Sequence, residues 1–205
     1  MPLLTVREML SLRRLVLTSI ATASLLYLSA ALAETPPLVT AEAAPPNGAG
    51  NRQLLANPGF ESGASGWSST VYDFAVDSSG AAHQGSYLAW MGGFGDRDSE
   101  TLYQDVSIPA DARHATFSFW VNIETDETSR RQAYDKLYVQ VRTPEGRVLR
   151  TLATYSNLNR TRGYVRKTFD LSRFAGQDVE MFLKVVEDNG KPSSFFLDDM
   201  TLTVQ

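Results

Sequence analysis

The residues that most often carry enzyme chemistry are scarce in this chain of 205 residues. It has no cysteine and only two histidines, His83 and His114, which excludes a thiol nucleophile, a thiolate zinc site and a three-histidine metal centre. No Gly-x-Ser-x-Gly pattern of a serine hydrolase is present. Both histidines fall in a predicted turn or at a predicted strand end, where such a side chain is usually solvated. The sequence therefore predicts that the protein is not an enzyme, although its carboxylates leave a glycosidase pair open.

A different kind of chemistry is suggested by aromatic and polar residues that alternate with apolar ones. Within 115–123, every second residue from Phe117 onward is apolar, and Trp120 and Asn122 lie between them. Within 137–142, Tyr138, Gln140 and Arg142 alternate with leucine and valine in the same way. Trp90, in a third short run, can join them. The predicted ligand-binding face therefore consists of Trp120, Asn122, Tyr138, Gln140, Arg142 and Trp90.

Such a face suits carbohydrate. A sugar presents apolar C–H surfaces surrounded by hydroxyl groups, so an aromatic plane beside amide and guanidinium donors matches it physically. An alternative is that the outward aromatic residues cover the sheet beneath a loop or pack against a neighbouring domain. Nucleic acid is not an expected partner, because the formal net charge is -4 and no block of basic residues occurs.

The elements that position these residues are predicted to be strands. The runs 115–123, 137–142 and 179–186 alternate with a period of two and are rich in β-branched and aromatic residues. Gly, Pro, Asn, Asp and Ser clusters separate them, as at Pro144–Gly146 and Asp188–Gly190. About nine or ten such strands without a helix predict an all-β fold, a two-sheet antiparallel β-sandwich, with the jelly roll as the preferred topology.

Only the last three quarters of the chain are expected to form this sandwich. Residues 1–33 combine three arginines, the apolar run 15–33 and the ending Ala31-Leu32-Ala33, which is typical of a secretory signal peptide. An uncleaved signal anchor is the alternative. Residues 34–52 are rich in Pro and Ala and contain no aromatic residue, so they predict a disordered tether. The folded domain is predicted at 53–205, and the protein is expected to be secreted or held in the cell envelope, with no membrane span after cleavage.

Several segments of this domain resemble carbohydrate-binding-module jelly rolls. Asn57–Glu61 followed by Trp67 is similar to their opening strand, Gly85–Gly93 and Thr101–Pro109 continue the pattern, and Ser194–Leu202 is similar to their last strand. Together they look like the MAM-like or galactose-binding-like domains attached to secreted bacterial peptidases (immune inhibitor A among them) and glycosidases. The resemblance covers almost all of 53–205. It implies a fold more firmly than a ligand, because this sandwich carries many functions.

The resemblance also implies a structural calcium ion that ties the first strand to the last. The matching positions are Asn57 and Glu61 at the start, and Asp198 and Asp199 at the end. Asp198 has the same alternation as Met200 and Leu202, so it is expected on the core face as a buried ligand or hydrogen-bond acceptor, with Asp199 nearer solvent. The alternative is that both accept backbone N–H bonds. A second acidic run, with Asp96, Asp98 and Glu100, is expected to be a solvated loop.

The functional prediction is a secreted, non-catalytic module that binds an extracellular carbohydrate or cell-surface polymer, with a structural calcium ion as a further expectation. The first alternative is a structural or protein-interaction domain of the envelope, in which the same face binds a protein partner. The second is a small glycosidase or lyase built on the jelly roll. Modules of this type are usually attached to a catalytic domain, and none is recognisable in this sequence.

Overall fold

The computed structural model describes residues 51–69, 75–78 and 81–205. The predicted signal peptide and all but the last two residues of the predicted tether lie outside these described residues. The chain from Gly50 to Gln205 forms one compact unit, which contains the whole predicted domain 53–205. Among the described residues, no helix is long and apolar enough to cross a membrane.

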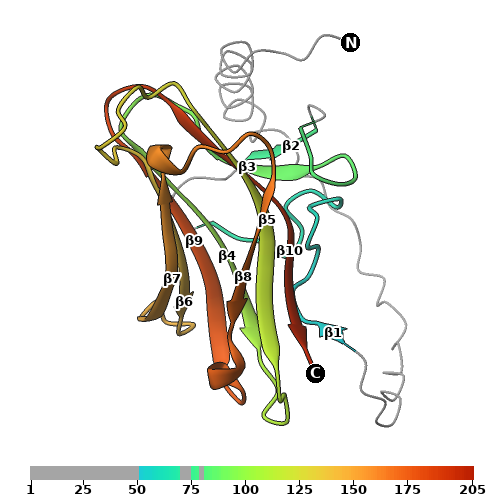
Figure 1. The fold of residues 1–205 in the computed structure, drawn as a ribbon. Coiled ribbons are helices and arrows are strands. Elements are labelled where there is room, and N and C mark those ends of the chain that lie inside the picture. Colours follow the sequence, from blue (N-terminus) through green and yellow to red (C-terminus); the bar gives the residue numbers. More distant parts are fainter. Residues whose placement is uncertain (1–50, 70–74, 79–80) are drawn as a thin grey trace, which may run out of the picture. The chain divides into compact units, whose positions relative to one another are not determined.

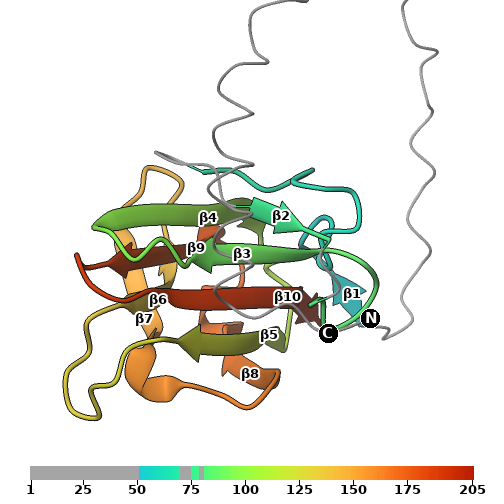
Figure 2. The same ribbon diagram turned by 90° about the horizontal axis from the view of Figure 1, so that it is seen from above.

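The first sheet is antiparallel and is built around the last strand of the chain. Its order is β2-β3-β10-β5-β8, and β1 pairs with the second half of β10. Figure 2 shows β2 and β8 at opposite borders of this sheet. Its strands are β1 (Arg52–Gln53), β2 (Ala75–Asp77), β3 (Leu88–Gly92), β5 (Ala115–Thr125), β8 (Val165–Asp170) and β10 (Ser193–Val204).

The second sheet lies against the first as a separate layer (Figure 1). Its order is β4-β9-β6-β7, and all its pairings are antiparallel. Its strands are β4 (Asp98–Ser107), β6 (Lys136–Arg142), β7 (Val148–Ser156) and β9 (Asp178–Glu187). From β3 to β10 the chain changes sheet at every connection except β6–β7, so the predicted two-sheet sandwich with jelly-roll character is confirmed. The helical turns among the described residues are the short 3₁₀ segments η1 (Asn157–Asn159) and η2 (Ser172–Phe174).

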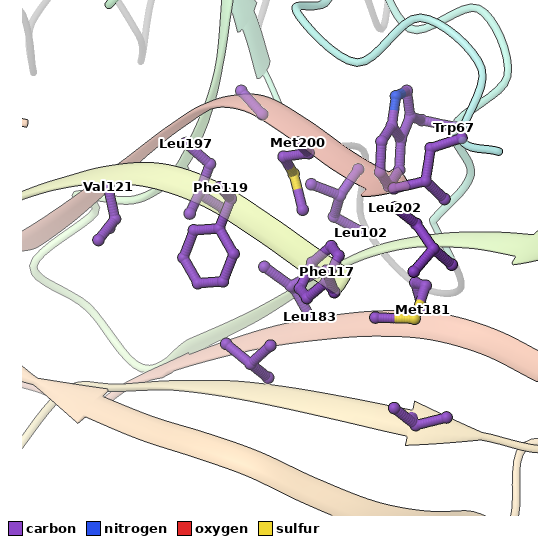
Figure 3. Close-up of a cluster of buried hydrophobic side chains, with 14 of the residues drawn as sticks. Trp67, Leu102, Phe117, Phe119, Val121, Met181, Leu183, Leu197, Met200 and Leu202 are labelled. Carbon is purple, nitrogen blue, oxygen red and sulfur yellow. The ribbon is translucent and has the colours of Figure 1, made fainter. Parts of the chain in front are cut away.

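Alternation of side chains explains both the strands and the core. In β5, Phe117, Phe119, Val121 and Ile123 are almost completely buried, and each such side chain contributes about 1.5–3 kcal/mol when it leaves water. Figure 3 shows Phe117, Phe119 and Val121 directed toward residues of the second sheet. The side chains labelled there from the other strands and the first loop are Leu102, Met181, Leu183, Leu197, Met200, Leu202 and Trp67.

The alternation of β10 changes phase at a β-bulge, which corrects one expectation. The pairing of β10 with β5 shifts between Asp198 and Thr201, and Asp199 has a φ of 47°. A bulge inserts an extra residue, so the residues on its two sides no longer alternate in step. Asp198 consequently lies opposite Trp120 on the outer face, whereas Met200 is in the core. The expectation that Asp198 shares the core face of Met200 was therefore wrong, although its burial was predicted correctly.

Candidate ligand-binding surface

The six residues predicted to form one face lie on two different faces. Trp90, Trp120 and Asn122 belong to the first sheet, and Tyr138, Gln140 and Arg142 belong to the second. Both β5 and β6 direct their apolar residues into the shared core, so their remaining side chains point away from it on opposite sides of the sandwich (Figure 1). The expectation of one continuous face was wrong, because the sequence does not show which strands share a sheet.

On the first sheet, Trp120 lies beneath a histidine. The rings of His83 and Trp120 are stacked with centroids 3.9 Å apart and an angle of 18° between their planes. Tyr164 meets His83 edge-on at 5.3 Å, and its hydroxyl donates a hydrogen bond to the Ala81 carbonyl. His83 is therefore not the solvated side chain that its turn predicted, whereas His114 is exposed. The stacked ring occupies one face of Trp120, as in the alternative in which a loop covers the aromatic residue.

The other two predicted residues on this sheet are also engaged. Trp90 is 4% exposed and packs against Phe196, with 5.3 Å between ring centroids. The Asn122 amide donates to Glu124 at 3.0 Å and accepts from the Thr161 hydroxyl at 2.7 Å. These contacts join β5 to the chain that leads into β8. The aromatic residues on the outer face of the first sheet are thus covered by neighbouring side chains, and little of their ring surface is exposed to solvent.

The carboxylates predicted to bind calcium hold the loop 83–87 against the end of the sandwich. Asp198 Oδ2 accepts the backbone N–H groups of His83 and Gln84 at 2.8 and 3.2 Å. Asp199 Oδ2 lies 2.6 Å from His83 Nδ1. Glu61 Oε1 accepts two further N–H groups of the loop, from Ser86 at 2.9 Å and Tyr87 at 3.0 Å. We call this set of contacts the clasp.

The clasp uses these carboxylates as hydrogen-bond acceptors. Burial raises the pKa of Asp198, the neighbouring Asp199 charge raises it further, and the N–H donors oppose both effects. The Asn57 side chain stabilises the turn that follows it, because its amide oxygen accepts the Ser62 N–H and its amide nitrogen donates to the Gly63 carbonyl. Among the described residues, no three acidic or histidine side chains are grouped so that they could hold a metal ion. The described contacts of these carboxylates are hydrogen bonds, and the calcium site stays a prediction.

The second acidic run is only partly a solvated loop. Asp96 is exposed, but β4 begins at Asp98 and Glu100 is 1% exposed. The Glu100 carboxylate accepts the Gly92 N–H at 2.5 Å. The expectation of a solvated loop was wrong for Glu100, because β4 extends further toward its N-terminus than the sequence pattern suggested.

The outer face of the second sheet carries the other three predicted residues in a regular arrangement. Directly paired residues on adjacent strands lie on the same face of a sheet, so the pairings arrange the outward side chains in rows. We call this surface the tyrosine face. Its three rows across β4, β9 and β6 are Thr101, Lys184 and Tyr138; Tyr103, Phe182 and Gln140; and Asp105, Glu180 and Arg142.

At the centre of the tyrosine face, Phe182 supports the groups around it. The Arg142 guanidinium carbon lies 3.3 Å from the centre of its ring, and the Tyr103 ring stacks at 6.1 Å. Gln140 Oε1 accepts from Arg142 Nε at 2.9 Å and from Nη2 at 2.6 Å. Phe182 itself is 3% exposed. The guanidinium and the amide are therefore fixed before any ligand arrives, which lowers the entropy lost on binding.

The charges on this face influence each other. Burial raises the pKa of Glu180, the nearby Asp105 raises it further, and the Arg142 charge lowers it. Burial lowers the pKa of Arg142, which the Glu180 charge opposes. The face therefore combines an acceptor, fixed donors and aromatic rings. Such a mixture suits a neutral ligand rich in hydroxyl groups.

Six of the nine residues of this face were not among the predicted site residues, and three of these six are Tyr103, Phe182 and Lys184. The signal was present, since all three alternate with core residues of their own strands, as Phe182 does with Met181 and Leu183. What the sequence could not provide was the pairing of β9 with both β4 and β6. That pairing places Phe182 between Tyr103 and Gln140.

Known proteins resemble this chain in structure, and the matches support the β-sandwich fold described above. No protein-family model and no curated protein matches the sequence. Among solved structures, the carbohydrate-binding module TmCBM61 in complex with β-1,4-galactotriose is 22% identical, covers 75% of this chain and 99% of its own, and superposes with a TM-score of 0.57. A family 16 carbohydrate-binding module is 19% identical over 73% of this chain and 98% of its own, with a TM-score of 0.48. The xylan-binding CBM22-1 of Paenibacillus barcinonensis Xyn10C is 16% identical over 74% and 94%, with a TM-score of 0.46.

The described domain therefore has the jelly-roll β-sandwich fold of carbohydrate-binding modules, as its sequence resemblance predicted. The superposition with TmCBM61 carries this conclusion, because it includes nearly all of that module. At such low identity the likeness concerns the fold and leaves the ligand to be argued from the residues of this chain.

Proposed function

We propose that this protein is an exported, non-catalytic module that binds carbohydrate through the tyrosine face. The observation that carries the proposal is the fixed group of Tyr103, Phe182, Arg142 and Gln140, with Tyr138 in the adjacent row. It combines aromatic rings with a preorganised amide and guanidinium. Export rests on the signal-peptide pattern of residues 1–33.

Separate sugar rings of one chain would lie on Tyr138 and Tyr103 while their hydroxyl groups bond to Gln140, Arg142 and Lys184. These side chains are half-buried and line the outer surface of the sheet. A site of this shape accepts a segment within a long chain, because a sheet face has no wall that would stop a polymer. Affinity in the micromolar to millimolar range is expected, which corresponds to about 4–8 kcal/mol.

The test compares two tyrosine variants by affinity electrophoresis in gels containing neutral β-glycans, with β-1,4-galactan first. Tyr138→Ala should weaken retardation about tenfold, since a lost aromatic contact removes about 1.4 kcal/mol. Tyr87→Ala is the matched control. Tyr87 is a tyrosine whose exposed fraction is 36%, and it directly precedes β3 of the first sheet, so it is not part of the tyrosine face. Equal retardation of the Tyr138→Ala variant and the unchanged protein would remove the tyrosine face as the site.

The two alternative functions have their own tests. If the tyrosine face binds a protein, cross-linking in the culture medium will capture a partner and Tyr138→Ala will prevent it. If the protein is a glycosidase or lyase, incubation will shorten the polysaccharide chains. A non-catalytic module would leave the length of the polysaccharide chains unchanged. Cleavage of the polysaccharide would therefore favour the enzymatic alternative over the proposed function.

A further inference from the structure

One border of the sandwich carries a concentration of positive charge that the proposed function does not use. Residues 147–169 contain six of the 19 basic residues and none of the 23 acidic residues. The rest of the chain therefore has a large excess of negative charge. We call the six cations the basic edge: Arg147, Arg150, Arg160, Arg162, Arg166 and Lys167.

The fold gathers these residues along one side. Arg147 directly precedes β7, and the other five lie in β7, in β8 or in the connection between them. These two strands are border strands of the two sheets. The strands face each other across this border, since Lys167 Nζ lies 5.1 Å from the centre of the Tyr155 ring. Hydrogen bonds from Ser172 chiefly lower the pKa of Asp170 at the end of β8, and the charge of Arg150 in β7 contributes to the same shift. The two border strands therefore present their charges together.

Most of this charge faces solvent. All members of the basic edge are exposed except Lys167, which is half-buried. None of them forms a salt bridge with a carboxylate in the described part of the chain, where the contact of His83 with Asp199 is the one ion pair found. Exposed cations without a salt bridge attract anions at moderate salt concentration.

A cleft of about 480 Å³ lies where the basic edge meets the loop between β5 and β6. Asn157 and Arg160, which precede β8, line it together with Glu127, Ser129 and Arg130 of the loop after β5. Its volume falls within the usual range of ligand pockets.

The lining residues differ in what they can still bind. Glu127 accepts the Lys191 N–H at 3.1 Å, and the Asn157 amide is bonded to Tyr134 and Gln132. The two guanidinium groups have no salt bridge to a described residue. An anionic group entering the cleft would therefore meet two available arginines.

We propose that the cleft and the basic edge bind a polysaccharide that carries carboxylate groups, such as a chain of uronic acid residues. Arg130 and Arg160 would hold one carboxylate, since a guanidinium binds this group through two parallel hydrogen bonds. The cations along β7 and β8 would attract the following carboxylates of the chain. This surface is separate from the tyrosine face, so the inference extends the proposed function without depending on it.

The charge distribution favours an acidic polysaccharide over nucleic acid. Proteins that bind nucleic acid are usually basic as a whole, whereas this sequence has a pI of about 5.2. Its net positive charge is concentrated along one border, whereas the rest of the chain has 13 basic and 23 acidic residues and would repel a long phosphate backbone. The cleft also suits a single planar carboxylate held between two guanidinium groups.

The test uses the purified full chain with polygalacturonate and its methyl ester, which differ only in carboxylate charge. We expect binding to polygalacturonate that weakens as salt rises, and at least tenfold weaker binding to the ester. The double variant Arg130→Gln and Arg160→Gln should lose at least tenfold in affinity for polygalacturonate. Because both side chains are exposed, its thermal midpoint should stay unchanged.

Arg113→Gln is the matched control, since Arg113 is exposed and precedes the start of β5, whereas the cleft lies beyond the end of that strand. It should bind polygalacturonate normally. Equal binding of the ester, full binding by the double variant, or stronger competition by duplex DNA than by polygalacturonate would overturn the inference. Failure of the proposed function is a different result: Tyr138→Ala would then bind neutral glycans like the unchanged protein.

Discussion

Among the single residues, Glu187 at the end of β9 shows how burial alters charge. It is 2% exposed, and its carboxylate accepts the N–H groups of Phe94 at 3.0 Å and Ser193 at 3.2 Å. Burial nevertheless raises its pKa from 4.5 to about 6, and the nearby Asp135 carboxylate adds to the effect. The hydrogen bonds therefore offset only part of the cost of burying this charge.

This shift predicts how stability depends on pH. The folded protein holds the Glu187 proton more tightly than the unfolded chain does, so the contribution is complete below pH 4.5 and is lost as pH rises through about 6. The loss amounts to about 2 kcal/mol by pH 7. It should be measured as the free energy of unfolding in denaturant at a series of pH values.

Glu187→Gln isolates this contribution from those of other acidic residues. The variant cannot ionise, and its amide N–H₂ faces backbone donors, so it should be less stable than the unchanged protein at every pH. The difference between the two proteins should shrink by about 2 kcal/mol between pH 4.5 and 7. A difference that stays constant over this range would contradict the assignment of the pH dependence to Glu187.

At the scale of elements, the loop 81–87 and the bulge of β10 depend on each other. The bulge brings Asp198 and Asp199 to the loop, and Glu61 holds the loop from the opening segment. Gly85 has a φ of 66°, and a Cβ atom there would fall on the Glu61 carboxylate. The close approach of this carboxylate to the backbone therefore requires glycine.

Gly85→Ala should consequently destabilise the domain by displacing Glu61 from the clasp. Gly146→Ala is the matched control, because Gly146 has a φ of 87° and no atom lies within 4 Å of the place for its Cβ. Both variants carry the strain of a positive φ, about 1–3 kcal/mol. Gly85→Ala should lose about 2 kcal/mol more, from charged hydrogen bonds, in chemical denaturation. Equal losses would show that the Glu61 contacts contribute nothing to stability.

The strands themselves were predictable from sequence, and their partners were not. The runs 115–123, 137–142 and 179–186 became strands with bounds displaced by two residues at most, because a core on one side imposes alternation on each strand alone. Alternation does not show which strands share a sheet, so Trp120 and Tyr138 were assigned to one face. A bulge also leaves no clear signal in the alternation, and this misplaced Asp198 relative to Met200.

For the molecule as a whole, the overall composition gave no indication of how charge is distributed over the surface. The chain is acidic overall, and its basic residues form no contiguous block. The strand order of the two sheets makes β7 and β8 edge strands at one border and so collects six cations that are spread over 147–169 in the sequence. Only the topology shows that this acidic protein has a strongly basic side.

The closing of the sandwich end also concerns the whole domain, since residues from its beginning and its end meet there. Calcium and the clasp are competing accounts of this closure. In the clasp, backbone N–H groups and His83 already bond to the carboxylates of Glu61, Asp198 and Asp199. Among the described residues, no group of three or more acidic or histidine side chains is arranged to hold a metal ion. Carboxylates satisfied in this way do not require a cation to remain buried.

The clasp therefore predicts that EDTA leaves the thermal midpoint of the purified protein unchanged, and that added calcium does not raise it. Calcium bound only to the folded state would instead stabilise it by mass action, by about 2.7 kcal/mol at a hundredfold excess over Kd. Differential scanning calorimetry with EDTA, and then with calcium in excess, separates the accounts. A midpoint that falls with EDTA and recovers with calcium would establish the predicted metal site, because backbone donors do not respond to a chelator.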